Sequence, residues 1–354
     1  MFAILLLALV VGFVMSGGFG EIKSTSQEQK TSASSTPIQK KIDKIILQES
    51  VFVPYWTLQY FTPEKEKTYF YFGVLGNKQG INTQDIGYER LDEYFAMLPK
   101  DAPRIVTIRM VDNSLNSQIL KDKNAQKKII DDTIKLAKTY DLDGVLFDFE
   151  MSSISFDAVT TRVTLFYKDF YTQIKDEGLA FYITMYGDTF YRVRPYDVKA
   201  INDYTDQIFI MAYDFHKARN NPGPNFPLNG RETYGYDFKK MVEDFKESIP
   251  LEKLAVVFGM FGYDWKLGED GKSIEMAKAL SLYEINKAFI ESCEFLDCQK
   301  GDDVKSFESW IKYKDEQGSS HEVWFENEKS VKIKREYLHS MGIDVVSFWA
   351  NSYY

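Results

Sequence analysis

The stretch DGVLFDFE, residues 143–150, has the pattern of a buried β-strand. Its apolar residues are typical of a strand that is buried on both faces, and two acids stand at its end. Because side chains alternate along a strand, Leu146 shares one face with Asp148 and Glu150, and the aromatic residues between them share the other face. We expect the aromatic face to pack against helices, and the first face to place two carboxylates side by side.

Similar apolar runs recur along the chain, and amphipathic helical patterns separate them. The eight runs are Val51–Trp56, Thr68–Leu75, Arg104–Val111, Gly144–Glu150, Ala180–Gly187, Gln207–Asp214, Leu254–Gly262 and Asp344–Ala350. The helical patterns include Gln126–Tyr140, Phe156–Asp176, Tyr236–Ser248 and Lys329–Met341. Strand and helix in repeated alternation predict an α/β fold in which the sheet closes into a (β/α)8 TIM barrel.

A long segment separates the seventh and eighth runs, and it contains a helix-like stretch at Ser281–Glu291. We interpret it as a small α+β insertion between strands 7 and 8, at about residues 265–326, on the catalytic face of the barrel. The barrel as a whole is expected over residues 46–354.

The N-terminus has a different character. Residues 2–15 (FAILLLALVVGFVM) are continuously apolar, and small residues follow them, although no Lys or Arg precedes them. This pattern predicts a signal peptide or an N-terminal membrane anchor over residues 1–20, followed by a polar linker over residues 21–45. Both alternatives predict an extracytoplasmic barrel, either secreted or tethered to the membrane through residues 2–15.

Composition excludes several classes of function. The net charge is −9 and no basic stripe stands out, which argues against nucleic acid as a partner. The three histidines are scattered without metal-ligand spacing, so we expect no metal. Cys293 and Cys298 either form a small loop disulfide or remain two free thiols. Aromatic residues make up 16% of the chain, and they serve either the core or a sugar-binding cleft.

Barrel enzymes place their active sites at the C-terminal ends of the strands. Two carboxylates as close as Asp148 and Glu150 raise the pKa of one of them, which keeps an acid protonated near neutral pH. The alternative is a pair of exposed acids in a loop. Other strand ends add further candidates, each of which is weak alone and equally compatible with a structural role. They are Tyr55 on the first run, Met211, Tyr213 and Asp214 on the sixth, Tyr263 on the seventh and Trp349 on the eighth.

Taken together, these motifs resemble glycoside hydrolase family 18, the family of chitinases and related N-acetylglucosaminidases. The family carries Asp-Gly-x-Asp-x-Asp-x-Glu on its fourth strand, Met-x-Tyr-Asp on its sixth and a Trp on its eighth, with an insertion between strands 7 and 8. The matching residues are Asp143, Gly144, Asp148, Glu150, Met211, Tyr213, Asp214 and Trp349. Segments 213–228 and 321–330 look similar to the bacterial branch that includes spore-cortex-lytic N-acetylglucosaminidases.

The resemblance implies a retaining, substrate-assisted hydrolysis of glycans that contain N-acetylglucosamine, such as peptidoglycan or chitin. In this scheme Glu150 is the general acid and base, Asp148 orients the substrate acetamide, and Tyr213 donates a hydrogen bond to the acetamide oxygen. Asp214 and Trp349 contact the sugar. The scheme needs no metal or organic cofactor, and we expect a monomer.

Two departures from the family pattern put the substrate in question. Leu146 replaces the first acid of the fourth-strand motif, and residues 109–113 stand where chitinases carry a Ser-x-Gly-Gly turn. An alternative function is therefore carbohydrate binding without catalysis on the same barrel. A third is a surface scaffold in which the insertion binds a protein partner.

Overall fold

The computed structural model describes residues 45, 47–152 and 156–354. The apolar segment at residues 2–15 and the expected linker, apart from Ile45, lie outside the described residues. Among the residues that are described, no helix has both the length and the apolar character needed to cross a membrane.

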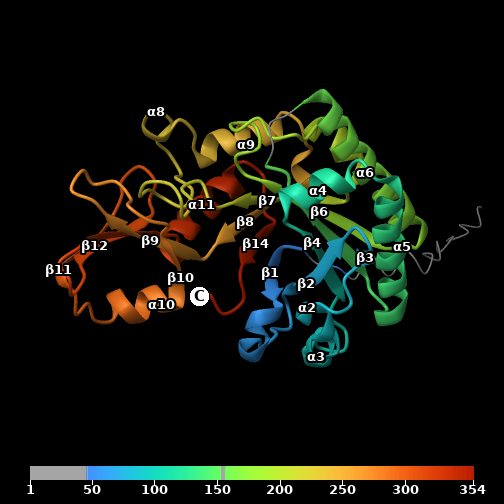
Figure 1. The fold of residues 1–354 in the computed structure, drawn as a ribbon, viewed down its shortest axis with the longest axis horizontal. Helices are drawn as coiled ribbons and strands as arrows, with labels where there is room; N and C mark the ends of the chain where they lie inside the picture. The colour runs from blue at the N-terminus through green and yellow to red at the C-terminus, as the bar shows by residue number, and fades with distance from the viewer. Residues whose placement is uncertain (1–44, 46, 153–155) are drawn as a thin grey trace, which may run out of the picture. The chain divides into compact units, whose positions relative to one another are not determined.

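A closed barrel of eight parallel strands forms the centre of the fold (Figure 1). Its strands are β1 (Glu49–Pro54), β2 (Thr68–Asn77), β4 (Ile105–Met110), β5 (Gly144–Phe149), β6 (Ala180–Tyr186), β7 (Gln207–Ala212), β8 (Leu254–Gly259) and β14 (Val346–Trp349). They neighbour one another in the order β1-β14-β8-β7-β6-β5-β4-β2, and pairing of β1 with β2 closes the ring. The predicted (β/α)8 TIM barrel is confirmed.

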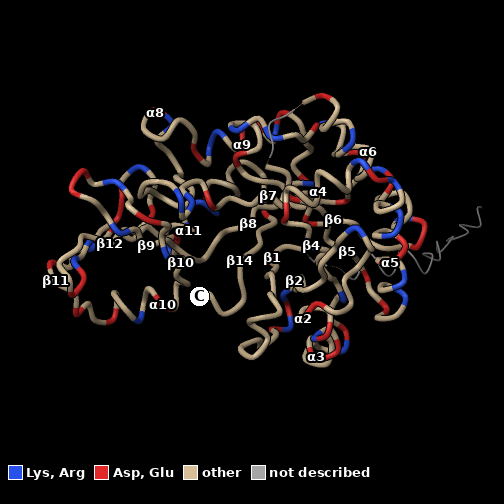
Figure 2. The backbone as a smooth tube through the Cα atoms, in the orientation of Figure 1, with Lys and Arg blue, Asp and Glu red and all other residues tan. Residues whose placement is uncertain are grey.

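Helices and short turns of helix connect the barrel strands. The α-helices outside the insertion are α2 (Ile86–Glu89), α3 (Leu91–Met97), α4 (Asn113–Ile119), α5 (Lys123–Tyr140), α6 (Asp157–Asp176), α7 (Val198–Ile201), α8 (Arg231–Tyr234), α9 (Phe238–Lys246) and α11 (Glu328–Ser340). A short strand, β3 (Gly80–Ile81), pairs with the end of β2. In Figure 2 the charged residues of both signs lie along outer helices such as α5 and α6, while the barrel strands are mostly uncharged.

The core has two layers, and β5 contributes to both as its alternation predicts. Leu146 points into the barrel, where it packs in a cluster that includes Phe70 and Phe209. On the other face of the strand, Phe147 and Phe149 contact Phe166 of α6, with ring centroids 5.4 and 5.5 Å away. Truncating a buried Phe of this kind to Ala costs about 3–5 kcal/mol of folding free energy. This packing fixes the strand that carries the two acids.

The insertion is a second sheet with antiparallel pairing, in the order β10-β9-β13-β12-β11. Its elements are β9 (Phe261–Leu267), β10 (Lys278–Ser281), α10 (Leu282–Ile285) with a π-helical turn (Asn286–Ile290), β11 (Leu296–Asp302), β12 (Ser309–Lys314) and β13 (Ser320–Phe325). The expected insertion between strands 7 and 8 of the barrel is therefore present, and a helical segment lies where the pattern at Ser281–Glu291 predicted it.

The seventh predicted run does not remain one strand. The prediction extended it to Gly262, but β8 ends at Gly259 and Phe261 already begins β9, which pairs with β10 and β13. A Cβ on Gly262 would lie 2.2 Å from the Trp324 carbonyl oxygen, so glycine allows the two insertion strands to approach. An uninterrupted apolar run cannot show where a chain exchanges one sheet for another, and this explains the difference.

Of the two alternatives for the cysteines, the structure has the disulfide. Cys293 and Cys298 are bonded, with their Cα atoms 6.4 Å apart. The bond closes a short loop between the π-helical turn and β11, within the insertion.

Candidate active site

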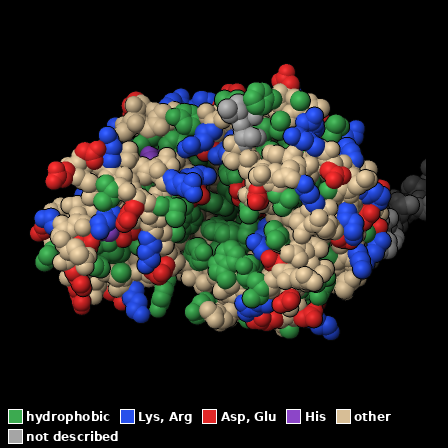
Figure 3. All heavy atoms as spheres, viewed as in Figure 1, with side chains coloured by type: hydrophobic (Ala, Val, Ile, Leu, Met, Phe, Trp, Pro, Cys, Tyr) green, Lys and Arg blue, Asp and Glu red, His purple; other side chains and the backbone are tan. Residues whose placement is uncertain are grey.

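A cavity of about 1050 Å³ lies at the C-terminal ends of the barrel strands, and the insertion forms part of its wall. Figure 3 shows hydrophobic side chains gathered in the hollow between the insertion and the barrel. The aromatic side chains that line it are Phe52, Trp56, Tyr60, Phe72, Tyr213, Phe261, Tyr263, Tyr283, Trp349, Tyr353 and Tyr354. The acids at the ends of β5 and β7, Asp148, Glu150 and Asp214, lie among these rings, and a few placed polar groups in an apolar pocket are usual for a site that orients a ligand.

Asp148 occupies the last part of β5 and is only 2% exposed. The hydroxyl of Thr184, on the neighbouring strand β6, donates to Asp148 Oδ1. Burial raises the pKa of Asp148 well above its usual range, and the charge of Glu150 raises it further. The Thr184 hydrogen bond and the positive charge of Arg109 act in the opposite direction. No hydrogen bond joins Asp148 Oδ2 to a residue that the structure describes.

Glu150 follows β5 directly, and the ladder with β4 fixes its backbone. Its N–H donates to the Met110 carbonyl at 2.9 Å, and its own carbonyl accepts from Asn116 Nδ2 at 2.8 Å. The Tyr186 hydroxyl, on β6, donates to Glu150 Oε2. Burial raises the pKa of Glu150, while the Tyr186 hydrogen bond and the charge of Lys217 partly offset that rise. Asp148 is buried and Glu150 half-buried, and the two acids form a pair that retains a proton at higher pH than free carboxylates do.

The end of β7 supplies a phenol and a third acid. Asp214 Oδ1 accepts a hydrogen bond from the Tyr263 hydroxyl at 2.7 Å, and burial raises the pKa of Asp214. Burial also raises the pKa of Tyr213 far above its usual value, so this phenol stays protonated and can donate. Met211 lies just before it on β7 and also lines the cavity.

Trp349 ends β14 and lies against other aromatic rings of the cavity. Its ring centroid is 4.7 Å from that of Phe72 in an edge arrangement and 6.3 Å from that of Trp56. Tyr55 is placed differently from the expectation, because Trp56 lines the cavity and Tyr55 does not. The Tyr55 ring instead lies 5.3 Å from the guanidinium of Arg109.

The structure thus brings seven of the eight predicted residues to one cavity and leaves Tyr55 outside its lining. The seven are Asp148, Glu150, Met211, Tyr213, Asp214, Tyr263 and Trp349. Sequence reasoning missed Thr184 and Tyr186, which hydrogen-bond the two acids. The signal was present, because the run Ala180–Gly187 ends with two hydroxyl side chains two positions apart, the same spacing as the acids of β5.

The two departures from the family pattern also have structural explanations. Leu146 lies in the apolar interior of the barrel, where no charge is needed. At the end of β4, Arg109 pairs with Asp85 at 2.7 Å, Val111 lines the cavity, and Asp112 caps α4 through the backbone N–H of Ser114 at 2.8 Å. Within residues 45, 47–152 and 156–354, no group of three or more His, Cys, Asp or Glu is arranged to hold a metal ion.

Comparison with known proteins places these features in one family. The family model described as glycosyl hydrolases family 18 matches residues 75–353. A cortical fragment-lytic enzyme of Bacillus anthracis is 26% identical over 248 residues, which cover 66% of this chain and 52% of that relative. Di-N-acetylchitobiase of Homo sapiens is 25% identical over 259 residues, which cover 65% of this chain and 66% of that relative. The chain spans about half the length of the first of these two relatives.

Solved structures share the fold. The spore cortex-lytic enzyme SleL of Bacillus cereus superimposes with a TM-score of 0.65 at 19% identity, over 87% of this chain and 71% of the other. At this identity the likeness concerns the fold alone.

Proposed function

The chain belongs to glycosyl hydrolase family 18, and from that membership we propose that it hydrolyses glycosidic bonds in glycans that contain N-acetylglucosamine. The observation that carries the proposal is the pair Asp148 and Glu150, side by side at the end of β5 in a cavity lined with aromatic rings. Rings stack on the apolar faces of sugars, and a buried carboxyl pair supplies the proton that a leaving glycosidic oxygen needs.

In the proposed mechanism Glu150 donates a proton to the leaving oxygen and then accepts one from the attacking water. The raised pKa of the pair supports this role, because the acid must be protonated when substrate binds. The nucleophile is the acetamido oxygen of the substrate, as in other substrate-assisted glycosidases, so the configuration at the anomeric carbon is retained.

Asp148 accepts a hydrogen bond from the acetamide N–H and stabilises the positive charge that develops on the sugar. Thr184 holds Asp148 Oδ1, which leaves Oδ2 for the substrate. Tyr213 donates to the acetamide oxygen, and Asp214 accepts hydrogen bonds from sugar hydroxyls. Trp349 forms the floor beneath the sugar ring. These groups are preorganised, so they require little rearrangement in the transition state.

Peptidoglycan and chitin-like glycans both satisfy this chemistry, and we propose an extracytoplasmic location in which the protein meets one of them. The Cys293–Cys298 disulfide supports that location, because disulfides persist in oxidising compartments.

The test is a digest of purified peptidoglycan and of chitin oligomers, with the products identified by mass and the anomer read by NMR before it equilibrates. We expect cleavage next to N-acetylglucosamine, a first-formed product of retained configuration, and no cleavage of the same sugars without the acetyl group. Tight binding of the oligomers without turnover would favour the non-catalytic alternative instead.

A further inference from the structure

Asp214 is held differently from the other two acids. It lies two residues past the end of β7, and its backbone has a φ of 59°, in the left-handed region that non-glycine residues seldom adopt. Such a conformation persists only where surrounding contacts impose it. Here the Asp214 N–H donates to Asn225 Oδ1 at 2.8 Å, and the next N–H, of Phe215, donates to the Asn225 carbonyl at 2.8 Å.

Asn225 connects three elements beside the cavity. Its Nδ2 donates to the carbonyl of Gly259 at 3.2 Å and to the carbonyl of Phe261 at 3.3 Å, at the end of β8 and the start of β9. The side chain is 2% exposed and does not line the cavity. A carboxamide is suited to this position because it accepts one hydrogen bond and donates two.

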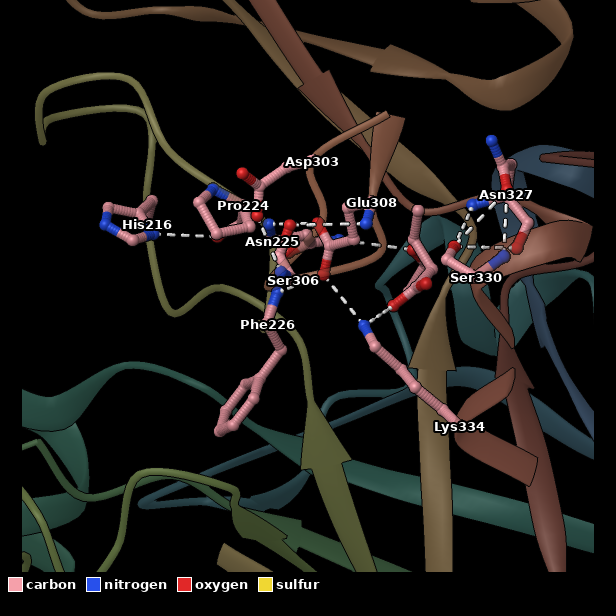
Figure 4. Close-up of polar contacts among 12 residues, drawn as sticks. His216, Pro224, Asn225, Phe226, Asp303, Ser306, Glu308, Asn327, Ser330 and Lys334 are labelled. Atoms are coloured by element: carbon pink, nitrogen blue, oxygen red, sulfur yellow. Dashed lines mark hydrogen bonds and ion pairs between the residues drawn. The ribbon is translucent and has the colours of Figure 1, made fainter. Parts of the chain in front are cut away.

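A buried ionic cluster in turn holds Asn225, as Figure 4 shows. Glu308, just before β12, accepts from the N–H of Asn225 at 2.5 Å and from the N–H of Phe226 at 2.8 Å. Lys334 of α11 donates to Glu308 at 2.7 Å and also to Glu326. The Glu308, Glu326 and Lys334 side chains have no exposed surface.

None of these three charged residues lines the cavity, and the mechanism proposed above does not use them. A buried ion pair contributes little to net stability, because desolvation offsets the attraction between the charges. The cluster does fix the backbone of Asn225 and Phe226, and through Asn225 it reaches the backbone of Asp214. Tyr263 of β9 then donates to the Asp214 carboxylate at 2.7 Å, so the insertion holds this acid from two sides.

We propose that Asn225, anchored by Glu308 of the insertion, is a positioning residue for Asp214. It acts through the Asp214 backbone rather than on the substrate. The effect on catalysis rests on the proposed function, whereas the effect on the Asp214 geometry does not.

The first test compares Asn225→Ala with a control variant, Asn327→Ala. Asn327 caps α11 through the N–H groups of Lys329 and Ser330, at 3.0 and 3.1 Å, and has no contact with Asp214. Both variants lose the side-chain hydrogen bonds of one carboxamide, which in Asn327 include one to the Ser309 hydroxyl at 2.7 Å. Crystal structures give the distance from the Tyr263 hydroxyl to Asp214 Oδ1, and steady-state kinetics give kcat and KM.

In Asn225→Ala we expect the Tyr263–Asp214 hydrogen bond to be lost and kcat to fall at least about tenfold with KM changed less, because small misplacements of site groups are costly. Asn327→Ala should keep the hydrogen bond and stay within about twofold of the wild-type kcat, despite a lower melting temperature. An unchanged Tyr263–Asp214 distance in Asn225→Ala, with kinetics equal to those of the control, would overturn the proposal.

A second variant, Glu308→Gln, keeps the volume of the anchor and removes one of its two carboxylate acceptors. Should Asn225→Ala not fold, this variant decides alone: we expect kcat to fall about threefold, with a displaced Asp214 in the crystal. Wild-type kcat and an unmoved Asp214 would contradict the proposal. If the wild-type protein cleaves no N-acetylglucosamine glycan, the proposed function fails, and the crystallographic comparison still decides whether Asn225 positions Asp214.

Discussion

The ends of β5 and β7 each present an acid that accepts a hydrogen bond from a tyrosine, but the two ends are built differently. Glu150 continues the alternation of its strand, and its donor, Tyr186, comes from the adjacent barrel strand. Asp214 has left its strand in left-handed backbone, and its donor, Tyr263, comes from the insertion. The barrel alone therefore holds Glu150, which is proposed to transfer the proton, while the position of Asp214 also depends on the insertion.

The largest effect is expected at the end of β5. Glu150→Gln keeps the shape of the side chain but removes the proton donor, so kcat should fall at least about a hundredfold, the usual scale for a lost general acid. The melting temperature should not decrease, because a neutral amide replaces a buried acid. Turnover of chitin oligomers and calorimetry measure the two quantities. Unchanged turnover would remove Glu150 from the mechanism.

A somewhat smaller loss is expected for Asp148→Asn. The amide cannot stabilise positive charge on the sugar, so kcat should fall about ten- to a hundredfold. The matched control is Asp122→Asn, an exposed acid that caps α5 through the N–H of Asn124 at 3.0 Å, where Asn caps equally well. Wild-type kcat in Asp148→Asn would indicate that the acetamide is held by another group.

Tyr186→Phe tests the barrel's hold on Glu150 through the pH dependence of the reaction. The Tyr186 hydrogen bond lowers the pKa of Glu150, so its removal raises that pKa. Glu150 then stays protonated to higher pH, and the basic limb of kcat/KM should move to higher pH. Tyr167→Phe is the control, because the buried Tyr167 hydroxyl has no hydrogen-bond partner among the residues that the structure describes. A basic limb that moves down would contradict this assignment.

The same difference between the two ends explains what the sequence could predict. The acids of β5 were predictable because strand periodicity alone places Asp148 and Glu150 on one face, with Leu146 below them in the barrel interior. The eight strands were predictable from another local signal, the apolar runs that helical patterns separate. The same alternation of side chains places Thr184 and Tyr186 on one face of β6. Their contact with the two acids, however, depends on β6 lying beside β5, which no local pattern shows.

The rest depends on contacts between residues far apart in the chain. Asn225 meets Glu308, 83 positions later, through a backbone N–H that every residue type except proline possesses. Tyr55 and Trp56 both end the first run, so the sequence does not distinguish them, yet a 3₁₀ turn, Tyr55–Tyr60, follows β1 and sends adjacent side chains in different directions. Neither the anchor nor the turn leaves a periodic signal in the sequence.

The smallest expected effect concerns Asp214, whose position also depends on the insertion. The Tyr263 hydrogen bond lowers the pKa of Asp214, so Tyr263→Phe raises that pKa and Asp214 is protonated at higher pH as the solution is acidified. If ionised Asp214 is the form that accepts hydrogen bonds from sugar hydroxyls, the acidic limb of kcat/KM moves to higher pH. Tyr186→Phe, in contrast, affects the basic limb. The shift should be smaller than that in Tyr186→Phe, because Tyr263 is only partly buried and water can replace its hydroxyl.

Tyr313→Phe is the matched control for this last variant, because its hydroxyl donates to Asp264 Oδ2 at 2.7 Å within the same insertion, outside the cavity. An acidic limb that moves in Tyr263→Phe but not in Tyr313→Phe assigns the shift to Asp214. Equal shifts in both variants would mean that loosening the insertion, rather than losing one hydrogen bond, changes the site. In that case the packing of the whole insertion, and not only the Tyr263 hydroxyl, affects the acids at the ends of the barrel strands.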